Sequence, residues 1–581
     1  MKKGLITVLM LLGMAFAMPG CASGTQSGNV PEGTNTAEGT SAAENGETAD
    51  NTGTEGNVQT DLYKDVYALP IQVIDDKYRT YYEVFVYSFY DSDGNGIGDL
   101  KGLTEKLDYI NDGDISTNTD LGCNGIWLMP IMPSTTYHKY DVTDYCAIDK
   151  EYGTMEDFEA FMSACGERDI HVLIDLVINH TSSKHPWFTE AVSYLQNLGD
   201  GEPSVTDCPY FEYYNFSKEK KSSNWYQVSG TEWYYEAPFW SEMPDLNLYS
   251  EAVRAEIAEI TQFWLDKGVA GFRLDAAKEY VSDATSSNVE ILTWLNDTVK
   301  AQKEDAYIVA EVWTDADTYA KYYASGIDST FDFQFASQDG IIACTLNGTG
   351  GKSPVVYGSA VEKVAGRLSE YNADFIDAPF YTNHDMGRSA GYYAGEGSTE
   401  KTKIAQAMNL LMSGNAFLYY GEELGMKGAG KDENKRAPMQ WSADTAAEGM
   451  CDGPEYMDSI KMKFGSLEEQ EADAASVYNY VKAVIHVRNA FPEIARGNTE
   501  YMEEISDEQV CVFRKTYEDS EILLLYNLSA EPVTLDRSGV TVNGQEWSSL
   551  FAKAVLLTGE EQITEEDTTL VLPPYSVCLY Q

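Results

Sequence analysis

Residues 171–180 read HVLIDLVINH, an apolar run that ends in the polar pair Asn179-His180. Three later segments have the same form: GVAGFRLDAAKEY (268–280), YIVAEVW (307–313) and FYTNHD (380–385). A single Asp after an apolar run is often only the first turn residue beyond a strand. Four such runs in succession are hard to explain by turns alone, so we expect a functional site where they end.

The polar residues at these ends are of the types that catalysis requires. Carboxylates, imidazoles and a guanidinium can transfer protons, attack as nucleophiles or hold charge. They are the carboxylates Asp175, Asp275, Glu311 and Asp385, the cation Arg273, and the imidazoles His180 and His384.

Short apolar runs alternate with helical patterns from Tyr81 onward. Most runs are apolar on consecutive residues, as in parallel strands that are covered on both faces. Amphipathic stretches lie between them, such as 155–168, 252–268 and 403–413. Eight strands alternating with helices predict an α/β fold of the (β/α)8 TIM-barrel type, whose active site forms at the carboxyl ends of the strands. The strand-like runs are VFVYSFY (84–90), GIWLMPI (125–131), HVLIDLVI (171–178), GFRLD (271–275), YIVAEVW (307–313), TFDFQF (330–335), FYTNHD (380–385) and AFLYYGEE (416–423).

Two regions depart from this alternation. Residues 181–247 are long, irregular and dense in aromatic side chains, which predicts a small inserted domain that forms one wall of the cleft. We expect more than half of its rings to form its own core. After Gly497 the runs VCVFRKTY, EILLLYNLS and TLVLPPYSVCLY have no helical period, so residues 496–581 are predicted to form a C-terminal antiparallel β-sandwich. The barrel then takes residues 61–180 and 248–495.

The N-terminus has the features of an export signal. Two lysines precede an apolar run at 5–18, which is too short for a comfortable membrane span. The run ends at MPGC (18–21), which resembles a bacterial lipoprotein signal (1–21) with lipid attached to Cys21; a plain secretory cleavage nearby is the alternative. Residues 22–60 are too poor in large apolar side chains to fold and are predicted to be a disordered tether. We therefore expect an extracellular protein anchored to the bacterial membrane.

Charge and cysteine content exclude some functions. With 40 Lys and Arg against 93 Asp and Glu, the formal net charge of −53 repels phosphate backbones, so no nucleic acid partner is expected. The eight cysteines beyond Cys21 form no CxxC pair, which argues against zinc. Cys123 and Cys165 fit free core residues, whereas Cys511 and Cys578 could pair only if their strands meet. We expect a monomer.

From Tyr81 to Gln581 the chain resembles the α-amylase family of glycoside hydrolases, because all four segments match that family in content and order. MPDLN (243–247) resembles a further family segment, in the form found in a subgroup between the oligo-1,6-glucosidases and the neopullulanases. The resemblance implies that Asp275 is the nucleophile, Glu311 the general acid/base and Asp385 a stabiliser of the transition state.

The resemblance also assigns residues that bind substrate. It implies that Arg273 keeps the nucleophile ionised and that His180 and His384 bind sugar hydroxyls. In TYHKYDVTDY (136–145), Tyr140 would stack on the sugar ring and His138 would hydrogen-bond to it, which is reasonable because a glucose ring has an apolar face. Asp175 either touches substrate or orients Arg273 and the local loops.

The chemistry requires these residue types independently of the family. Cleavage with retention uses two carboxyl groups about 5–5.5 Å apart, one to attack the anomeric carbon and one to protonate the departing oxygen. Arg273, two residues before Asp275 and on the same strand face, would hold the nucleophile in its charged form. Glu311 must start protonated, so we expect an enclosed site, near other carboxylates, that raises its pKa.

A glycine-rich loop, DSDGNGIGD (91–99), has the pattern of a structural Ca²⁺ site. Oxygen ligands on alternate positions suit Ca²⁺, whereas Gly102 at position twelve excludes an EF-hand. Similar loops after the first barrel strand bind calcium in part of the family. The alternative is a metal-free loop of Asx turns. A second calcium site of the family would involve Asn179. The candidate ligands are Asp91, Asp93, Asn95, the Ile97 carbonyl and Asp99.

The substrate is indicated by the residues after the nucleophile. Ala276 resembles the α-1,4-acting members, and Lys278 matches a residue that contacts the leaving-group sugar, but Glu279 stands where many α-amylases have His. We expect an α-amylase that cleaves internal α-1,4 bonds of starch and related glucans with retention. The alternatives are an exo-acting or transferring relative (a maltogenic amylase or neopullulanase, an α-glucosidase or a 4-α-glucanotransferase) and a non-enzymatic, glycan-binding surface lipoprotein.

Overall fold

The computed structural model describes residues 62–282 and 284–581, and the signal, Cys21 and the whole tether (22–60) predicted above lie outside these ranges. At the centre is a seven-stranded sheet in the order β10-β1-β2-β3-β7-β8-β9, in which every neighbouring pair is parallel. Its strands are β1 (Thr80–Val84), β2 (Gly125–Leu128), β3 (His171–Leu176), β7 (Gly271–Leu274), β8 (Tyr307–Ala310), β9 (Ser329–Thr330) and β10 (Ala416–Tyr419).

Residues 378–380 close this sheet into a barrel. A parallel bridge joins Phe331, just after β9, to Ala378, and a second joins Phe380 to Phe417 in β10. The segment therefore takes the eighth position between the two edge strands, and closure leaves no free sheet edge. The predicted (β/α)8 barrel is confirmed.

Several strands differ in their limits from the predicted runs. The first strand is Thr80–Val84 rather than 84–90, and Val86–Ser88 form a 3₁₀ helix. Only Ser329–Thr330 of the region around 330–335 pair as a strand, and the run 380–385 makes a single bridge at Phe380. An apolar run marks burial, which continues past the last ladder hydrogen bond at the barrel end, whereas a strand needs a paired neighbour.

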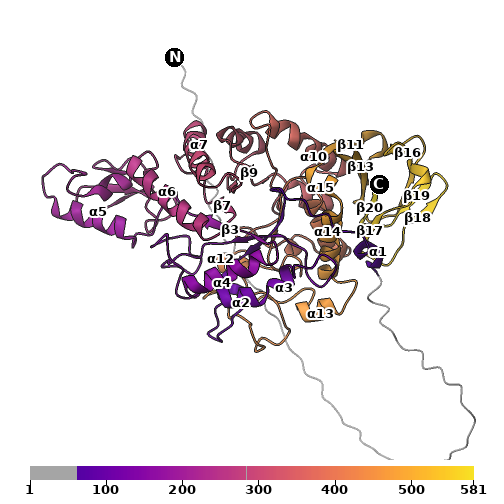
Figure 1. Ribbon diagram of the computed structural model, residues 1–581, viewed down its shortest axis with the longest axis horizontal. Coiled ribbons are helices and arrows are strands. Elements are labelled where there is room, and N and C mark those ends of the chain that lie inside the picture. The colour runs from indigo at the N-terminus through magenta and orange to yellow at the C-terminus, as the bar shows by residue number, and fades with distance from the viewer. Residues whose placement is uncertain (1–61, 283) are drawn as a thin grey trace, which may run out of the picture. The chain divides into compact units, whose positions relative to one another are not determined.

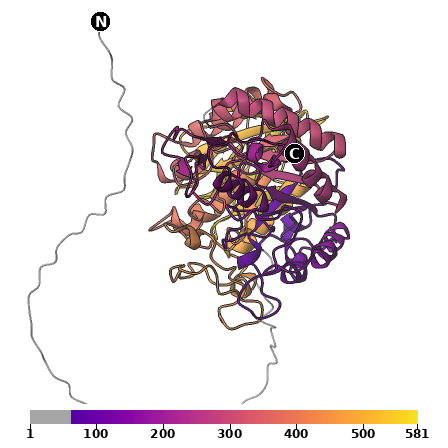
Figure 2. The same ribbon diagram turned by 90° about the vertical axis from the view of Figure 1, so that its left-hand side faces the viewer.

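Helices cover the outside of the barrel (Figure 1, Figure 2). The predicted amphipathic stretches are helical, and α4 begins with a capping box between Thr154 and Asp157. The longer helices are α4 (Met155–Gly166), α6 (Glu251–Asp266), α7 (Thr285–Gln302), α10 (Pro354–Ser369), α11 (Ser398–Leu410) and α14 (Val477–Ala490). The shorter ones are α1 (Lys64–Tyr67), α2 (Leu100–Glu105), α3 (Leu107–Ile110), α8 (Ala316–Tyr319), α9 (Ile341–Asn347), α12 (Asp432–Lys435), α13 (Leu467–Glu471) and α15 (Pro492–Arg496).

The insertion between β3 and α6 has its own small sheet and core. Helix α5 (Pro186–Asn197) is followed by an antiparallel sheet in the order β4-β6-β5, and Leu195, Val228 and Trp233 form a buried cluster beside it. Of the aromatic rings in residues 181–247 only Phe239 and Trp240 are exposed, but Phe188, Tyr213 and Tyr214 belong to the barrel core, so the rings are divided between two cores rather than forming mainly the insertion's own. The strands are β4 (Phe216–Ser217), β5 (Trp225–Gln227) and β6 (Tyr234–Glu236).

The C-terminal region consists of antiparallel sheets, as predicted. One has the order β11-β12-β13-β20-β17 and another β14-β19-β18, and Figure 1 places β20 and α5 on opposite sides of β3 and β7. Both β12 and β20 pair with β13 rather than with each other, so Cys511 and Cys578 do not meet, and every cysteine in the described ranges is free. The strands are β11 (Asn498–Tyr501), β12 (Val510–Tyr517), β13 (Ser520–Asn527), β14 (Val533–Asp536), β15 (Thr541–Val542), β16 (Gln545–Glu546), β17 (Ala554–Leu557), β18 (Thr564–Glu566), β19 (Thr569–Leu572) and β20 (Ser576–Tyr580).

Within residues 62–282 and 284–581, no helix combines the length and the apolar character that crossing a membrane requires.

Candidate active site

The four apolar segments that end in polar residues meet at the carboxyl end of the barrel. Asp175 lies on β3, Arg273 on β7, and Asp275, Glu311 and Asp385 just beyond strand ends. A pocket of about 390 Å³ opens beside them. Its lining residues are His138, Tyr140, His180, Phe239, Met243, Asp275, Ala276, Lys278, Glu279, Glu311, Trp313, Asp385, Asp432 and Arg436.

Arg273 is the central cation of the site. Its Nη1 donates to both oxygens of Asp175 at 2.7 and 2.9 Å and to Asp275 Oδ1 at 2.8 Å, while its Nη2 donates to Glu311 Oε2 at 2.8 Å. The guanidinium is fully buried and lies behind the pocket wall. One cation therefore holds both predicted catalytic carboxyl groups in a single cluster, with Asp175 as its buried partner.

Glu311 lies in surroundings that favour its protonated form. Burial raises its pKa, and the negative charges of Asp275 and Asp385 raise it further, whereas the Arg273 guanidinium partly offsets this. Its Oε2 also accepts from the backbone N–H of Ala276 at 3.0 Å. Ala276 adopts a φ of 46°, a left-handed conformation that is uncommon for residues other than glycine. The turn after the nucleophile thus contacts Glu311 through its strained residue.

Asp385 lies between two cations. His384 Nε2 lies 3.2 Å from Asp385 Oδ2, and Arg436 Nη2 lies 3.1 Å from Asp385 Oδ1. Although burial opposes ionisation, these positive charges hold the pKa of Asp385 well below its usual range. Arg436 also pairs with Asp432 on α12. Asp385 is therefore a permanently charged carboxylate that faces the pocket.

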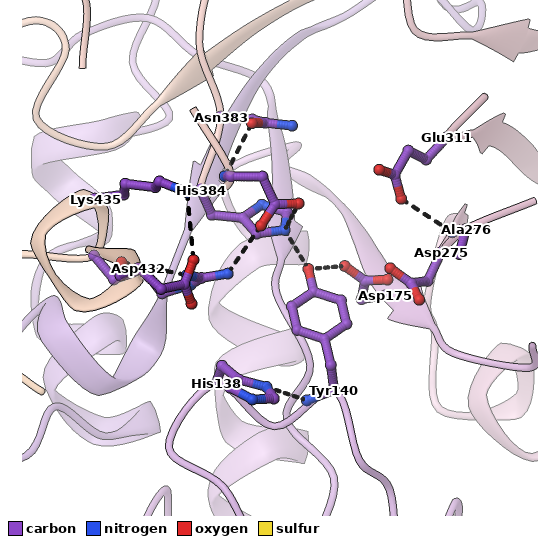
Figure 3. A network of polar contacts seen from close by, with 12 residues as sticks. His138, Tyr140, Asp175, Asp275, Ala276, Glu311, Asn383, His384, Asp432 and Lys435 are labelled. Atoms are coloured by element: carbon purple, nitrogen blue, oxygen red, sulfur yellow. Dashed lines mark hydrogen bonds and ion pairs between the residues drawn. The ribbon is translucent and has the colours of Figure 1, made fainter. Parts of the chain in front are cut away.

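His384 is a charged imidazole beneath the pocket. Its Nδ1 lies 2.6 Å from Glu83 Oε1 on β1, and its Nε2 lies 2.7 Å from the Tyr140 hydroxyl. Burial lowers its pKa, but Asp385 and Glu83 outweigh burial and raise the pKa to about 9. Figure 3 shows the Tyr140 hydroxyl between His384 and Asp175, to which it donates at 3.0 Å.

The other two histidines are neutral. Burial, together with the nearby charge of Arg436, lowers the pKa of His138 to about 4, and its Nδ1 accepts from the Tyr140 backbone N–H at 3.2 Å. Burial also lowers the pKa of His180, whose Nε2 donates to the Tyr140 carbonyl at 3.1 Å. Both line the pocket, as does Tyr140. They can donate to or accept from sugar hydroxyls without adding charge.

The structure brings most predicted site residues to the pocket wall and places three behind it. Lys278 and Glu279 line the pocket and form a pair at 3.2 Å. Those behind the wall are Asp175, Arg273 and His384, each buried and bonded to a residue of the wall.

Sequence reasoning missed the residues that reach the pocket from loops without a motif. Asp432 and Arg436 come from the long segment after β10, and they are identified only by the contact of Arg436 with Asp385 and of Asp432 with Arg436. Trp313 stands two residues after Glu311, a spacing that places both side chains on the same side of an extended segment and could have been read. Trp313 and Phe239 are each about half exposed, at 49% and 51%.

The chain is similar to known proteins. The family description "Alpha amylase, catalytic domain" matches residues 83–497. The chain belongs to the α-amylase family of glycoside hydrolases. The site is therefore that of an α-amylase-family enzyme, and the resemblance noted from the four segments is confirmed.

Individual members of the α-amylase family are similar over most of their length. The solved structure of Eubacterium rectale Amy13B is 51% identical, with a TM-score of 0.84 over 89% of this chain and 98% of that one. "Alpha-amylase 3" of Dictyoglomus thermophilum is 37% identical over 78% of this chain and 85% of its own length. "Probable oligo-1,6-glucosidase 3" of Bacillus subtilis is 26% identical over 86% of this chain and 98% of its own. The family thus includes both α-amylases and oligo-1,6-glucosidases.

The loop 91–99 of this α-amylase-family chain gathers three carboxylates. Oxygens of Asp91, Asp93 and Asp99 lie within 4.8 Å of one another. Asp91 also accepts from the backbone N–H of Gly94 and Gly96, at 2.7 and 2.6 Å, and Asp99 caps α2, so the loop is held in a defined shape. Convergent hard oxygen donors fit Ca²⁺.

Proposed function

We propose that this protein is an α-amylase that hydrolyses internal α-1,4-glucosidic bonds of starch and related glucans with retention. The observation that supports it most is the single guanidinium of Arg273 between Asp275 and Glu311, with Glu311 in surroundings that raise its pKa. A charged nucleophile and a protonated acid side by side are what the retaining reaction needs.

In the first step, a carboxylate oxygen of Asp275 forms a bond to the anomeric carbon as the glycosidic C–O bond breaks. Glu311 gives its proton to the departing oxygen. In the second step, Glu311 takes a proton from water, whose oxygen replaces Asp275 at the anomeric carbon. Asp385, ionised between His384 and Arg436, faces the developing positive charge of the sugar.

Around this centre, His138, Tyr140 and His180 would contact the sugar at the cleavage point, and Lys278 the leaving-group sugar. We assign Asp175, Arg273 and His384 to holding these residues in place, because each is buried behind the pocket wall. Asp91, Asp93 and Asp99, with Asn95 and the Ile97 carbonyl, would hold a structural Ca²⁺.

The proposal includes location. We propose an exported, monomeric enzyme anchored in the bacterial membrane by lipid on Cys21, with residues 22–60 as the tether and the glucan as its partner. Substituting Cys21 should release the protein from the membrane fraction, and retention of the variant there would contradict the anchor.

An exo-acting or transferring enzyme is the second candidate, since oligo-1,6-glucosidases are among the relatives and Glu279 departs from the α-amylase pattern. A glycan-binding lipoprotein without activity is the third, but Asp275, Glu311 and Asp385 are all present.

Product analysis on amylose separates these candidates. We expect a mixture of maltooligosaccharides early in the reaction, because an endo-acting enzyme cuts at many positions. A single small product, or longer chains, would contradict endo cleavage. Asp275→Asn should abolish hydrolysis while glucan binding persists, because the amide cannot attack the anomeric carbon. Turnover retained in that variant would refute the assignment of the nucleophile.

A further inference from the structure

Tyr456 combines a high exposure with a strained backbone. Its side chain is 74% exposed, and its φ is +72°. A left-handed φ in a bulky residue costs about 1–3 kcal/mol and persists only where the surroundings hold it. Among the described residues, the other aromatic with a positive φ is Tyr575, which is buried. Packing therefore explains Tyr575 and leaves Tyr456 to be explained.

The segment around Tyr456 is fastened to α12. Lys431 donates from Nζ to the Tyr456 carbonyl at 3.2 Å and pairs with Asp458 at 2.6 Å. Asn434 donates to the Asp458 carboxylate at 2.9 Å and accepts from the Asp458 backbone N–H at 2.8 Å. These contacts fix the carbonyl of Tyr456 and both the side chain and the backbone of Asp458. They therefore hold Tyr456 in its strained conformation.

Helix α12 connects this segment to the catalytic pocket. Asp432, next to Lys431, lines the pocket, and so does Arg436, which contacts Asp385. Figure 3 shows Asp432 on the side of His384, away from Glu311. Tyr456 is therefore joined, through Lys431, to the helix whose Asp432 and the following Arg436 line the pocket on the side of Asp385.

The chemistry around the ring fits a sugar. A glucose unit has an apolar face that stacks on an aromatic ring and hydroxyls that bond to charged groups beside it. Glu455 lies close enough to hydrogen-bond the Tyr456 hydroxyl, and with its charge this raises the pKa of that hydroxyl. Asp458 and Lys431, each about half exposed, flank the same segment.

We propose that Tyr456 is a stacking platform for a glucosyl unit of an α-glucan chain that extends out of the catalytic pocket past Asp432 and Arg436. This rests on the proposed function, since it requires a substrate longer than the pocket. A glucan on this path occupies Tyr456 only when it is long enough to leave the pocket on this side. Tyr456 thus makes the enzyme favour long chains over short ones.

The test removes the ring and keeps the backbone. Tyr456→Asn retains a residue that tolerates left-handed φ, and Tyr456→Phe retains the ring. We expect Tyr456→Asn to raise KM for amylose about five-fold, the size of one lost stacking contact, with KM for a short chromogenic maltoside unchanged. Tyr456→Phe should keep the wild-type KM for both substrates. Phe551→Asn, at a residue 76% exposed in the C-terminal region, is the matched control and should change neither KM.

The outcomes separate this inference from the proposed function. Equal KM for amylose in Tyr456→Asn and the wild type overturns the platform, and so does an equal rise for both substrates, which would indicate a structural effect. Hydrolysis of both substrates by the wild type keeps the proposed function in either case. A wild type that hydrolyses neither substrate overturns both proposals. If Tyr456 instead binds a protein partner, KM for amylose stays unchanged, which also overturns the inference.

Discussion

Arg273 is one cation among three carboxyl groups. One guanidinium faces three carboxyl groups, those of Asp175, Asp275 and Glu311, all buried or nearly so. Three ionised carboxylates around one cation would leave excess negative charge in a medium of low dielectric, so one group is better neutral. Burial raises the pKa of Asp175 to about 7 and also raises that of Glu311, and of these two groups only Glu311 lines the pocket and is also affected by the charge of Asp385. The proposed acid, Glu311, is thus the carboxyl group of the pocket wall whose surroundings favour its neutral form.

The raised pKa of His384 should make the free energy of unfolding depend on pH. Its pKa is about 9 in the folded protein, against about 6.5 when unfolded. The protonated form is therefore favoured by folding, and its stabilisation, about 3 kcal/mol, is fully present below pH ~6.5 and is lost as the pH rises through about 9. The stability difference between the wild type and His384→Gln should shrink from pH 6 to 10, as measured by denaturant unfolding.

Glu83→Gln is the companion variant for this test. Because Glu83 supports the charge on His384, the variant should lose its pH-dependent stability at a lower pH than the wild type. A stability difference between wild type and His384→Gln that is constant from pH 6 to 10 would show that His384 is not charged in the folded protein.

At the scale of elements, the site lies at the strand ends, and the helices packed around the strands are stabilised by caps at their first turns. Helix α4 precedes β3, and its first turn is closed by the Thr154–Asp157 capping box. Thr154 Oγ1 accepts from the Asp157 N–H at 3.2 Å, and Asp157 Oδ2 accepts from the Thr154 N–H at 2.9 Å. These bonds satisfy amide groups that the helix itself cannot.

Thr154→Ala should lower the free energy of unfolding by about 1 kcal/mol, the usual cost of losing an N-cap side chain. Thr349→Ala, at another exposed threonine, is the control: Thr349 caps the end of α9 only through its backbone N–H, which the variant keeps, so stability should change by less than about 0.5 kcal/mol. Denaturant unfolding measures both. Equal losses in the two variants would contradict a specific role for the cap.

At the scale of the whole molecule, the loop 91–99 joins segments that are far apart in sequence. Asp91 forms a bridge with Gly449, and the Gly96 carbonyl accepts from the Asp452 N–H at 2.8 Å. Residues 449–458 then reach α12 through Asp458. An ion bound at this loop would stabilise contacts between the first and last parts of the barrel.

Removal of calcium should therefore lower Tm. A ligand at 100 times its Kd stabilises by about 2.7 kcal/mol, so we expect a chelator to lower Tm by about 5 °C and Ca²⁺ to restore it. Asp93→Asn keeps the acceptor for the Asn95 N–H but removes one charge, so its Tm should respond less to Ca²⁺. Calorimetry with and without chelator tests this. An unchanged wild-type Tm would contradict a structural ion.

The sequence by itself determined the barrel and the C-terminal sheets and singled out Asp275, Glu311 and Asp385 as candidate catalytic residues, because periodicity and strand-end motifs are local patterns. Only the tertiary structure decided where the strands end, since a strand needs a paired neighbour. It also decided that Arg436 and Glu83 complete the site. Glu83 and His384 are 301 positions apart, and no local pattern reports such a pair. Closure of the barrel brings them together and so sets the charge on His384.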